Sequence, residues 1–227
     1  MRYIINTLVL IVLVSSLAKG QDRFFDEVDD FYQQHVQQGK VDYAAIKAQP
    51  AALKGLLQQA STLAKSRIST EADKAVLINT YNLYVIDGIV EAYPVASPQA
   101  VSNFFDRPVV SIEGKTYSLN QLEKVLLLKQ TTDARLHFAL VCAAVGCPQL
   151  ITNAYRPEQL DAQLDTQTRS ALNDPGFTRV YPGEERVQVS QLFEWYKQDF
   201  TREHSSVLGF INQYRDEPIP PYYRLSH

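Results

Sequence analysis

The stretch STEADKAVLINTYNLYVIDGIVEAYP, residues 69–94, decides the fold because it predicts the longest helix of the chain. A Ser-Thr pair at its start is followed by Glu71 and Asp73, which is the pattern of a helix N-cap with acidic residues in the first turn. Pro94 cannot continue a helix, so we expect the helix to end near Tyr93.

Shorter elements are predicted on both sides of this helix. Apolar residues at helical spacing predict a helix over residues 24–38, which Gly39 would end as a C-cap, and another helix opened by Pro50. On the C-terminal side, two hairpins and four helices are predicted over residues 109–117, 118–129, 157–172, 177–189, 190–200 and 203–214. Helices dominate, so the expected class is α+β: a predominantly helical single domain with a small sheet and two short hairpins.

The N-terminus has the pattern of a signal peptide over residues 1–20. Arg2 supplies a basic start, residues 4–17 are mostly apolar, and small residues at Ala18 and Gly20 suit cleavage before Gln21. This apolar run is short for a membrane span, which needs about 20 residues, although an uncleaved anchor is the alternative. No later segment is apolar enough to cross a bilayer. We therefore expect an exported protein, periplasmic or secreted, with no stable membrane span after cleavage.

The rest of the chain is expected to contain an N-terminal helical extension, one domain and a Pro/Tyr-rich tail, over residues 21–60, 61–216 and 217–227. The formal net charge is −3, and removal of Arg2 and Lys19 with the signal peptide would make the mature chain more acidic. Phosphate binding requires a basic patch, so the charge argues against a nucleic-acid partner. Two cysteines are too few for a disulfide-framework protein.

Residues 137–148, HFALVCAAVGCP, contain both cysteines and one of the four histidines. The apolar run between His137 and Cys142 predicts a short buried strand, which Gly146 and Pro148 would end. Folds often place functional groups at the ends of strands. An offset of five residues puts the ring and the thiol on opposite faces of a straight strand. A bend or bulge would therefore be required to pair them.

Three interpretations of this segment are open. In the first, the segment forms a thiol-dependent site with Cys142 as nucleophile, His137 as base and Glu123 as the group that orients the ring. In the second, Cys142 and Cys147 form a structural disulfide, which an oxidising compartment outside the cytoplasm favours. In the third, His137 and both cysteines bind a metal, but their spacing matches no standard zinc pattern. We assign no metal and no cofactor.

Polar residues elsewhere could complete a site. Asn79 and Asn82 are three residues apart and share one helix face. They could form a polar pocket wall, or they could be buried amides that bond loop backbone, which is the interpretation we favour. Glu123 could orient His137 or form an ion pair with Arg135, which we also place in the candidate pocket together with Cys147.

Aromatic residues near the C-terminus are expected to contribute to the core. Trp195, Tyr196 and Phe200 lie at helical spacing, and Asp199 between them is expected to be a surface or capping partner.

Several of these segments occur together in one order: Asn79–Tyr84 with Tyr93-Pro94, Ser118-Leu119 with Leu122-Glu123, Asp133–Leu140, Cys142 with Gly146-Cys147-Pro148, and Trp195-Tyr196 with Asp199-Phe200. In this order the chain resembles the family catalogued as domain of unknown function 547, over residues 60–215. Ala134 and Ala144 stand where the family often has Pro and Ser. The resemblance implies a helical domain with a small sheet, and it points to matching site positions at His137, Cys142, Glu123, Asn79 and Asn82.

The functional expectation is a non-catalytic binding or scaffold module of the envelope, with an unidentified small-molecule or peptide ligand. The alternative is a thiol-dependent hydrolase or acyltransferase that uses the Cys/His site.

Overall fold

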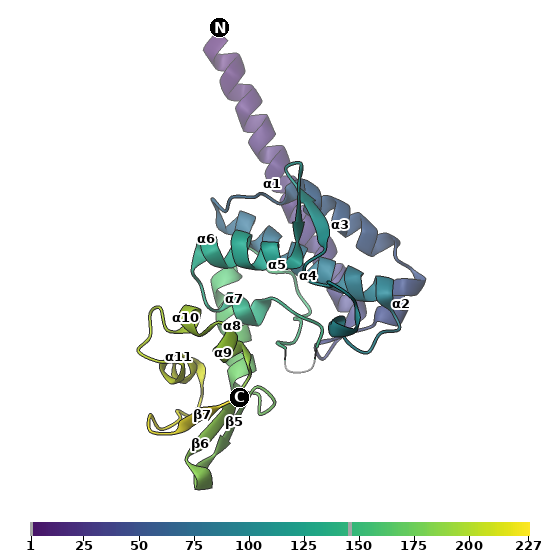
Figure 1. The fold of residues 1–227 in the computed structure, drawn as a ribbon. Coiled ribbons are helices and arrows are strands. Elements are labelled where there is room, and N and C mark those ends of the chain that lie inside the picture. Colours follow the sequence, from purple (N-terminus) through teal and green to yellow (C-terminus); the bar gives the residue numbers. More distant parts are fainter. Residues whose placement is uncertain (1, 145–146) are drawn as a thin grey trace.

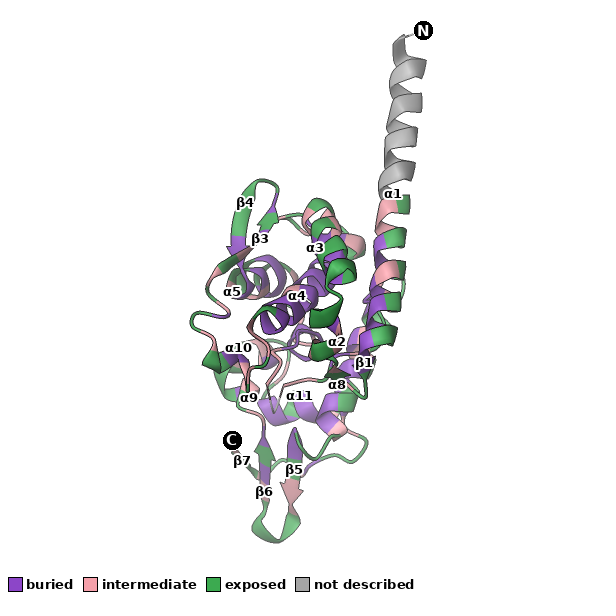
Figure 2. Cartoon of the chain, turned by 90° about the vertical axis from the view of Figure 1, so that its right-hand side faces the viewer, coloured by how far each residue is buried: buried purple, intermediate pink, exposed green. Residues whose placement is uncertain are grey.

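The computed structural model describes residues 2–144 and 147–227, with side chains from residue 19 onward. The predicted long helix is confirmed as α4, Glu71–Ala92. It begins with a capping box: the Thr70 hydroxyl accepts from the Asp73 backbone N–H at 3.1 Å, and the Asp73 carboxylate accepts from the Thr70 N–H at 3.0 Å. Seventeen of its residues are buried, and Figure 2 shows α4 enclosed by the other elements. A helix buried on nearly all sides forms the centre of the domain.

Three helices of the N-terminal part pack around α4: α1 (Arg2–His35), α2 (Tyr43–Ala48) and α3 (Ala51–Leu63). Between α1 and α2, β1 (Val36–Gln37) and β2 (Lys40–Val41) form a small hairpin. The predicted C-cap role of Gly39 is wrong. Gln38 and Gly39 have φ values of +50° and +74°, so they form the two-residue turn of this hairpin.

After α4, a short 3-10 helix η1 (Pro98–Ala100) leads to the hairpin of β3 (Pro108–Ile112) and β4 (Lys115–Ser118). Its turn at Glu113-Gly114 is where the sequence predicts it, and both residues have positive φ. The helix predicted next is also confirmed, as α5 (Leu119–Gln121), η2 (Leu122–Leu128) and α6 (Lys129–Thr131). Its middle section η2 is π-helical and carries Glu123. Such π segments are frequent at functional sites.

The strand predicted after His137 is wrong, because Leu136–Ala139 form the short helix α7. A short apolar run suits either a strand or a buried helix, so local pattern could not decide between them. The extended residues that follow α7 bond the side chain of Asn82 and pair with no strand in the described part of the chain. The Asn82 amide donates to the Ala139 carbonyl, and its oxygen accepts from the Val141 N–H, both at 3.0 Å.

The C-terminal part comprises α8 (Leu160–Asn173), β5 (Thr178–Tyr181), η3 (Pro182–Glu184), β6 (Arg186–Val189), α9 (Leu192–Trp195), α10 (Lys197–Phe200), α11 (Val207–Tyr214) and β7 (Arg224–Ser226). β5 and β6 form the second predicted hairpin, in antiparallel register with Val180 opposite Val187. The tail adds β7 parallel to β6, a pairing that the sequence does not predict. The single helix predicted over residues 190–200 is two short helices, α9 and α10.

Two groups of buried apolar side chains hold these elements together. The larger group runs from α1 to η2 and extends through α7 to Leu164 on α8. The smaller group lies among α8, the β5–β6 hairpin and α9 to α11, and Phe138 of α7 belongs to it. Figure 1 shows α7 and α8 where the two parts meet. The fold is the expected α+β type, a mostly helical single domain with small sheets. In the described part of the chain, no helix is both long and apolar enough to span a membrane.

Candidate functional site

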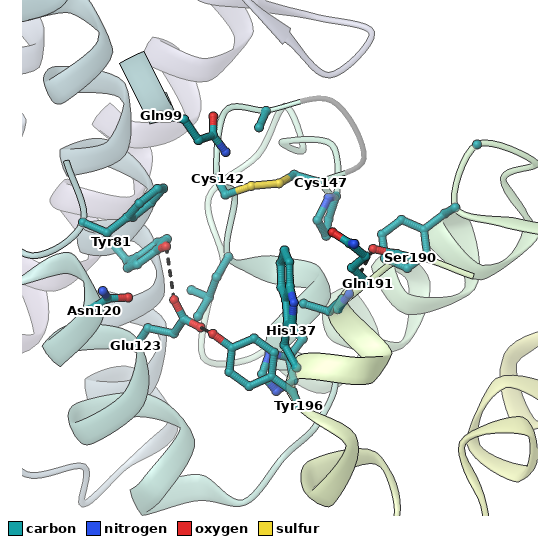
Figure 3. Close-up of a pocket in the computed structure, with 18 residues that line it drawn as sticks. Tyr81, Gln99, Asn120, Glu123, His137, Cys142, Cys147, Ser190, Gln191 and Tyr196 are labelled. Carbon is teal, nitrogen blue, oxygen red and sulfur yellow. Dashed lines mark hydrogen bonds between the residues drawn. A yellow bond between two sulfur atoms is a disulfide. The ribbon is translucent and has the colours of Figure 1, made fainter. Parts of the chain in front are cut away.

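A cavity of about 510 Å³ opens between the two parts of the domain (Figure 3). One wall comes from α4, η2 and the loop after η1, and the opposite wall comes from residues 176–196. Residues around α7 and the disulfide connect the two walls. The lining residues are Tyr81, Gln99, Phe105, Asn120, Glu123, His137, Leu140, Cys142, Ala144, Cys147, Pro148, Gly176, Phe177, Ser190, Gln191, Leu192, Trp195 and Tyr196.

Glu123 reaches the cavity from the π-helical section η2 and is held there by two tyrosines. Its carboxylate accepts a hydrogen bond from the Tyr196 hydroxyl at 2.7 Å and a longer one from the Tyr81 hydroxyl at 3.4 Å (Figure 3). Burial raises the pKa of both phenols, and the nearby Glu123 charge raises the pKa of each further. Both hydroxyls therefore stay protonated and act as donors to Glu123.

His137 is oriented by Asp199 of α10, and the role predicted for Glu123 is wrong. The Nε2 atom of His137 lies 2.9 Å from Asp199 Oδ2. The imidazole is buried and packs against the rings of Tyr196 and Phe200, with centroids 4.2 and 5.1 Å away. Its Nδ1 atom has no hydrogen-bond partner among the described residues. If Nε2 carries the proton that Asp199 accepts, Nδ1 is left as the basic nitrogen.

The hydrogen bond with His137 is the main cause that holds the pKa of Asp199 below its usual range. A carboxylate whose pKa is lowered by folding stabilises the protein above its unfolded-state pKa of about 3.9, and this contribution is lost as the pH falls through the folded-state value. We expect Asp199→Asn to lower the free energy of unfolding at pH 7 by about 1 kcal/mol. The difference from wild type should shrink as the pH falls below about 4.

Urea unfolding of both proteins from pH 7 to pH 3 measures this difference. The matched control is Asp30→Asn, since Asp30 is exposed and forms no ion pair in the described structure. A difference that stays constant over this pH range would contradict the prediction.

Cys142 and Cys147 are joined in a disulfide, with their Cα atoms 5.9 Å apart, inside the usual range for such a bond. Of the three interpretations of residues 137–148, this is the structural disulfide. In the oxidised state neither sulfur can act as a nucleophile or a metal ligand. No cluster of three or more His, Cys, Asp or Glu side chains arranged to hold a metal is found in residues 2–144 and 147–227. Gly146, which was predicted to end the strand together with Pro148, lies outside the described residues.

Asn79 and Asn82 lie behind the cavity wall, and neither is among the lining residues. Both are fully buried and bond backbone, which is the interpretation favoured from the sequence. Asn79 bonds the carbonyl and N–H of Tyr155 at 2.8 and 3.1 Å, as Asn82 bonds the segment after α7. The two amides therefore hold the segments before and after the disulfide, at residues 139–141 and at Tyr155, against one face of α4.

Arg135 is also outside the cavity lining. Its guanidinium bonds Asp133 at 3.0 Å and Asp161 at 2.8 Å, and these two bonds are the main contributions that raise its pKa. The expected ion pair between Arg135 and Glu123 is therefore wrong. The partners of Arg135 are instead Asp133, two residues away in the sequence, and Asp161 of α8.

Trp195 was expected in the core, but its residue is 68% exposed and lies at the cavity. Phe200 takes the core position, fully buried against Phe193 and Phe210. The two residues are five positions apart, which is about 140° around a helix, so they would point to different sides even of a continuous helix. Tyr196, also expected in the core, lines the cavity and bonds Glu123. Four residues of the site were therefore not predicted as such from the sequence, Tyr81, Trp195, Tyr196 and Asp199, although all four lie in the motifs that carry the family resemblance.

The fold and the cavity define a small helical α+β domain with one polar, aromatic-lined recess between its two parts. Residues 65–171 match the model of the family described as Protein of unknown function, DUF547, and this part of the chain belongs to that family. The match includes Glu123, His137 and both cysteines but ends before Trp195 and Asp199. No curated protein and no solved structure shows a significant match.

Proposed function

We propose that the protein is a non-catalytic binding module of the cell envelope whose cavity takes a small molecule or one side chain of a peptide. The observation that carries this proposal is the composition of the cavity wall. Aromatic rings from both parts of the domain face a recess in which a few polar groups are fixed by hydrogen bonds, with Glu123 held by two tyrosines. A concave site lined by apolar and aromatic side chains, with a few oriented polar groups, is typical of ligand-binding pockets.

Two features support a location outside the cytoplasm. The first twenty residues have the charge and apolar pattern of a signal peptide. The Cys142–Cys147 disulfide suits an oxidising compartment, because cytoplasmic thiols are normally kept reduced.

Trp195 gives a direct test, because it is the only tryptophan of the chain and lies at the cavity. We expect small-molecule or peptide ligands found by ligand-observed NMR to shift the Trp195 indole N–H resonance and to change its fluorescence. The matched control is Tyr222→Phe, an exposed aromatic residue outside the cavity lining, which should leave ligand affinity unchanged. Ligands that bind the protein without moving the Trp195 signals would refute the cavity as the binding site.

A second candidate function, a thiol-dependent hydrolase or acyltransferase, is favoured by one specific observation. His137 lines the same cavity as the disulfide and is bonded to Asp199, in the arrangement of a base and an orienting carboxylate. After reduction by a dithiol, which is itself oxidised to a disulfide, His137 would accept the Cys142 proton and the thiolate would attack the carbonyl carbon of an ester. The C–O bond would then break, the alcohol would leave with the proton from His137, and water or an acceptor alcohol would take the acyl group from the thioester.

Thiol titration separates the two functions. The thiol enzyme requires a reduced protein that turns over an acyl ester, such as a nitrophenyl ester, and a Cys142→Ser variant that does not. The binding module requires no free thiol before reduction and no ester turnover after it.

A further inference from the structure

Glu123 differs from the other shielded acidic residues because it has no cationic partner in the part of the chain that the structure describes. Eight Asp and Glu residues with described side chains are buried or half-buried. Seven of them form ion pairs with Lys, Arg or His: Glu27, Asp29, Asp73, Asp87, Asp133, Asp165 and Asp199. Glu123 is the exception among the described residues, and its two partners are the neutral hydroxyls of Tyr81 and Tyr196.

The described part of the cavity wall offers no compensating positive charge, because none of the described residues that line it is a lysine or an arginine. His137 is hydrogen-bonded to the Asp199 carboxylate, so the pair as a whole carries no net positive charge. A charge that is partly removed from water is costly unless a counter-charge or strong hydrogen bonds compensate it. A carboxylate has about four acceptor sites, of which these two hydroxyls occupy two.

The other lining groups also suit a positively charged ligand. Five aromatic rings face the cavity, from Tyr81, Phe105, Phe177, Trp195 and Tyr196. The faces of aromatic rings attract cations, and indole does so most strongly. A carboxylate together with several rings therefore favours an organic cation over a neutral or anionic ligand of the same size.

We infer that the cavity binds an organic cation, an ammonium or guanidinium group on a small molecule or peptide side chain, with Glu123 as its counter-charge. This inference rests on the proposed binding function and names the class of ligand. Tyr81 and Tyr196 position the carboxylate, and the exposed Trp195 covers the bound cation at the mouth.

The test compares three probes of one shape: benzylammonium, benzyl alcohol and benzoate. Calorimetry and the Trp195 indole resonance measure binding of each probe to the intact protein. We expect benzylammonium to bind at least about tenfold more tightly than benzyl alcohol, and benzoate to bind most weakly. The preference should weaken with added salt, because the interaction is between opposite charges.

Two variants locate the charge responsible. Glu123→Gln keeps the shape of the side chain and removes its charge, so we expect it to abolish the preference for benzylammonium. The matched control is Glu194→Gln, since Glu194 is an exposed neighbour of Trp195 outside the cavity lining, and the preference should remain. The probe series on the wild-type protein does not depend on either variant folding.

Equal affinity for benzylammonium and benzyl alcohol would overturn the inference and leave the cavity as a binding site for neutral ligands. A preference that persists in Glu123→Gln would also overturn it, since another group would then supply the charge. If none of the three probes binds at millimolar concentration, the inference is overturned. The proposed binding function is then judged separately by whether any other ligand moves the Trp195 signals.

Discussion

Replacing Asn82 by alanine is expected to destabilise the protein by about 4 kcal/mol, because it leaves two buried backbone groups without partners. The Asn82 side chain is fully buried on α4, and both ends of its amide are used. The amide nitrogen donates to the Ala139 carbonyl and the amide oxygen accepts from the Val141 N–H. An unpaired buried donor or acceptor costs roughly 1–3 kcal/mol, and a replacement as short as alanine cannot reach either group.

The loss is a large part of the total stability of about 5–15 kcal/mol that single domains usually have. We expect the midpoint of thermal unfolding to fall by on the order of 10 °C. The segment that Asn82 fastens leads into the disulfide, so the Cys142–Cys147 wall of the cavity should also become mobile. Faster amide hydrogen exchange at Val141, at a temperature where the protein remains folded, would report this local effect.

Asn153→Ala is the matched control, because Asn153 is exposed and its removal leaves no buried group unpaired. We expect it to change stability by less than about 0.5 kcal/mol. If Asn82→Ala and Asn153→Ala have equal unfolding free energies, the Asn82 amide does not fasten the segment after α7 as the structure indicates.

Replacing Phe138 by alanine is expected to destabilise the protein by about 3–5 kcal/mol through loss of burial and creation of a cavity. Phe138 is fully buried at the centre of the smaller core. Its ring lies within 6.2 Å, centroid to centroid, of four other phenylalanine rings, those of Phe177, Phe193, Phe200 and Phe210. Interiors pack densely, so these rings cannot close the space without moving.

The effect should also reach the cavity, because Phe138 follows His137 on α7 and packs on Phe200 beside Asp199. Loss of the ring removes a support of the hydrogen bond between Asp199 and His137. Urea unfolding measures the stability, and the NMR shifts of the His137 ring protons report the local change.

Phe138→Leu is the conservative control, since leucine retains much of the apolar volume. We expect it to cost less than half as much as alanine. If the two variants lower the free energy of unfolding equally, stability does not depend on how much of the Phe138 volume is filled. That result would contradict this description of the smaller core.

Local sequence determined most of the secondary structure. The start of α4 is set by Thr70 and Asp73, which are neighbours along the chain, and its end is set by Pro94. The β3–β4 turn follows from Glu113-Gly114, where backbone with positive φ is required. The family resemblance also came from sequence, because it depends on residue types in a given order.

Local pattern failed where distant contacts decided the conformation. Residues 136–141 could form either a helix or a strand, and the bonds to Asn82, 57 and 59 residues away, support a helix followed by an extended segment. Trp195 was expected in the core from its aromatic character and helical neighbours, but the packing of distant elements leaves it exposed at the cavity.

The sequence by itself determined most of the helices, the turns of two hairpins, the family and the segment in which to look for a site. Only the tertiary structure decided the partners within that site: Asp199 for His137, 62 residues apart, and Tyr196 for Glu123, 73 residues apart. The physical reason is that caps and turns depend on residues within one or two turns of chain. The environment of a carboxylate or an imidazole depends on which distant elements pack against it. The spacing of residues in one sequence does not predict which elements these are.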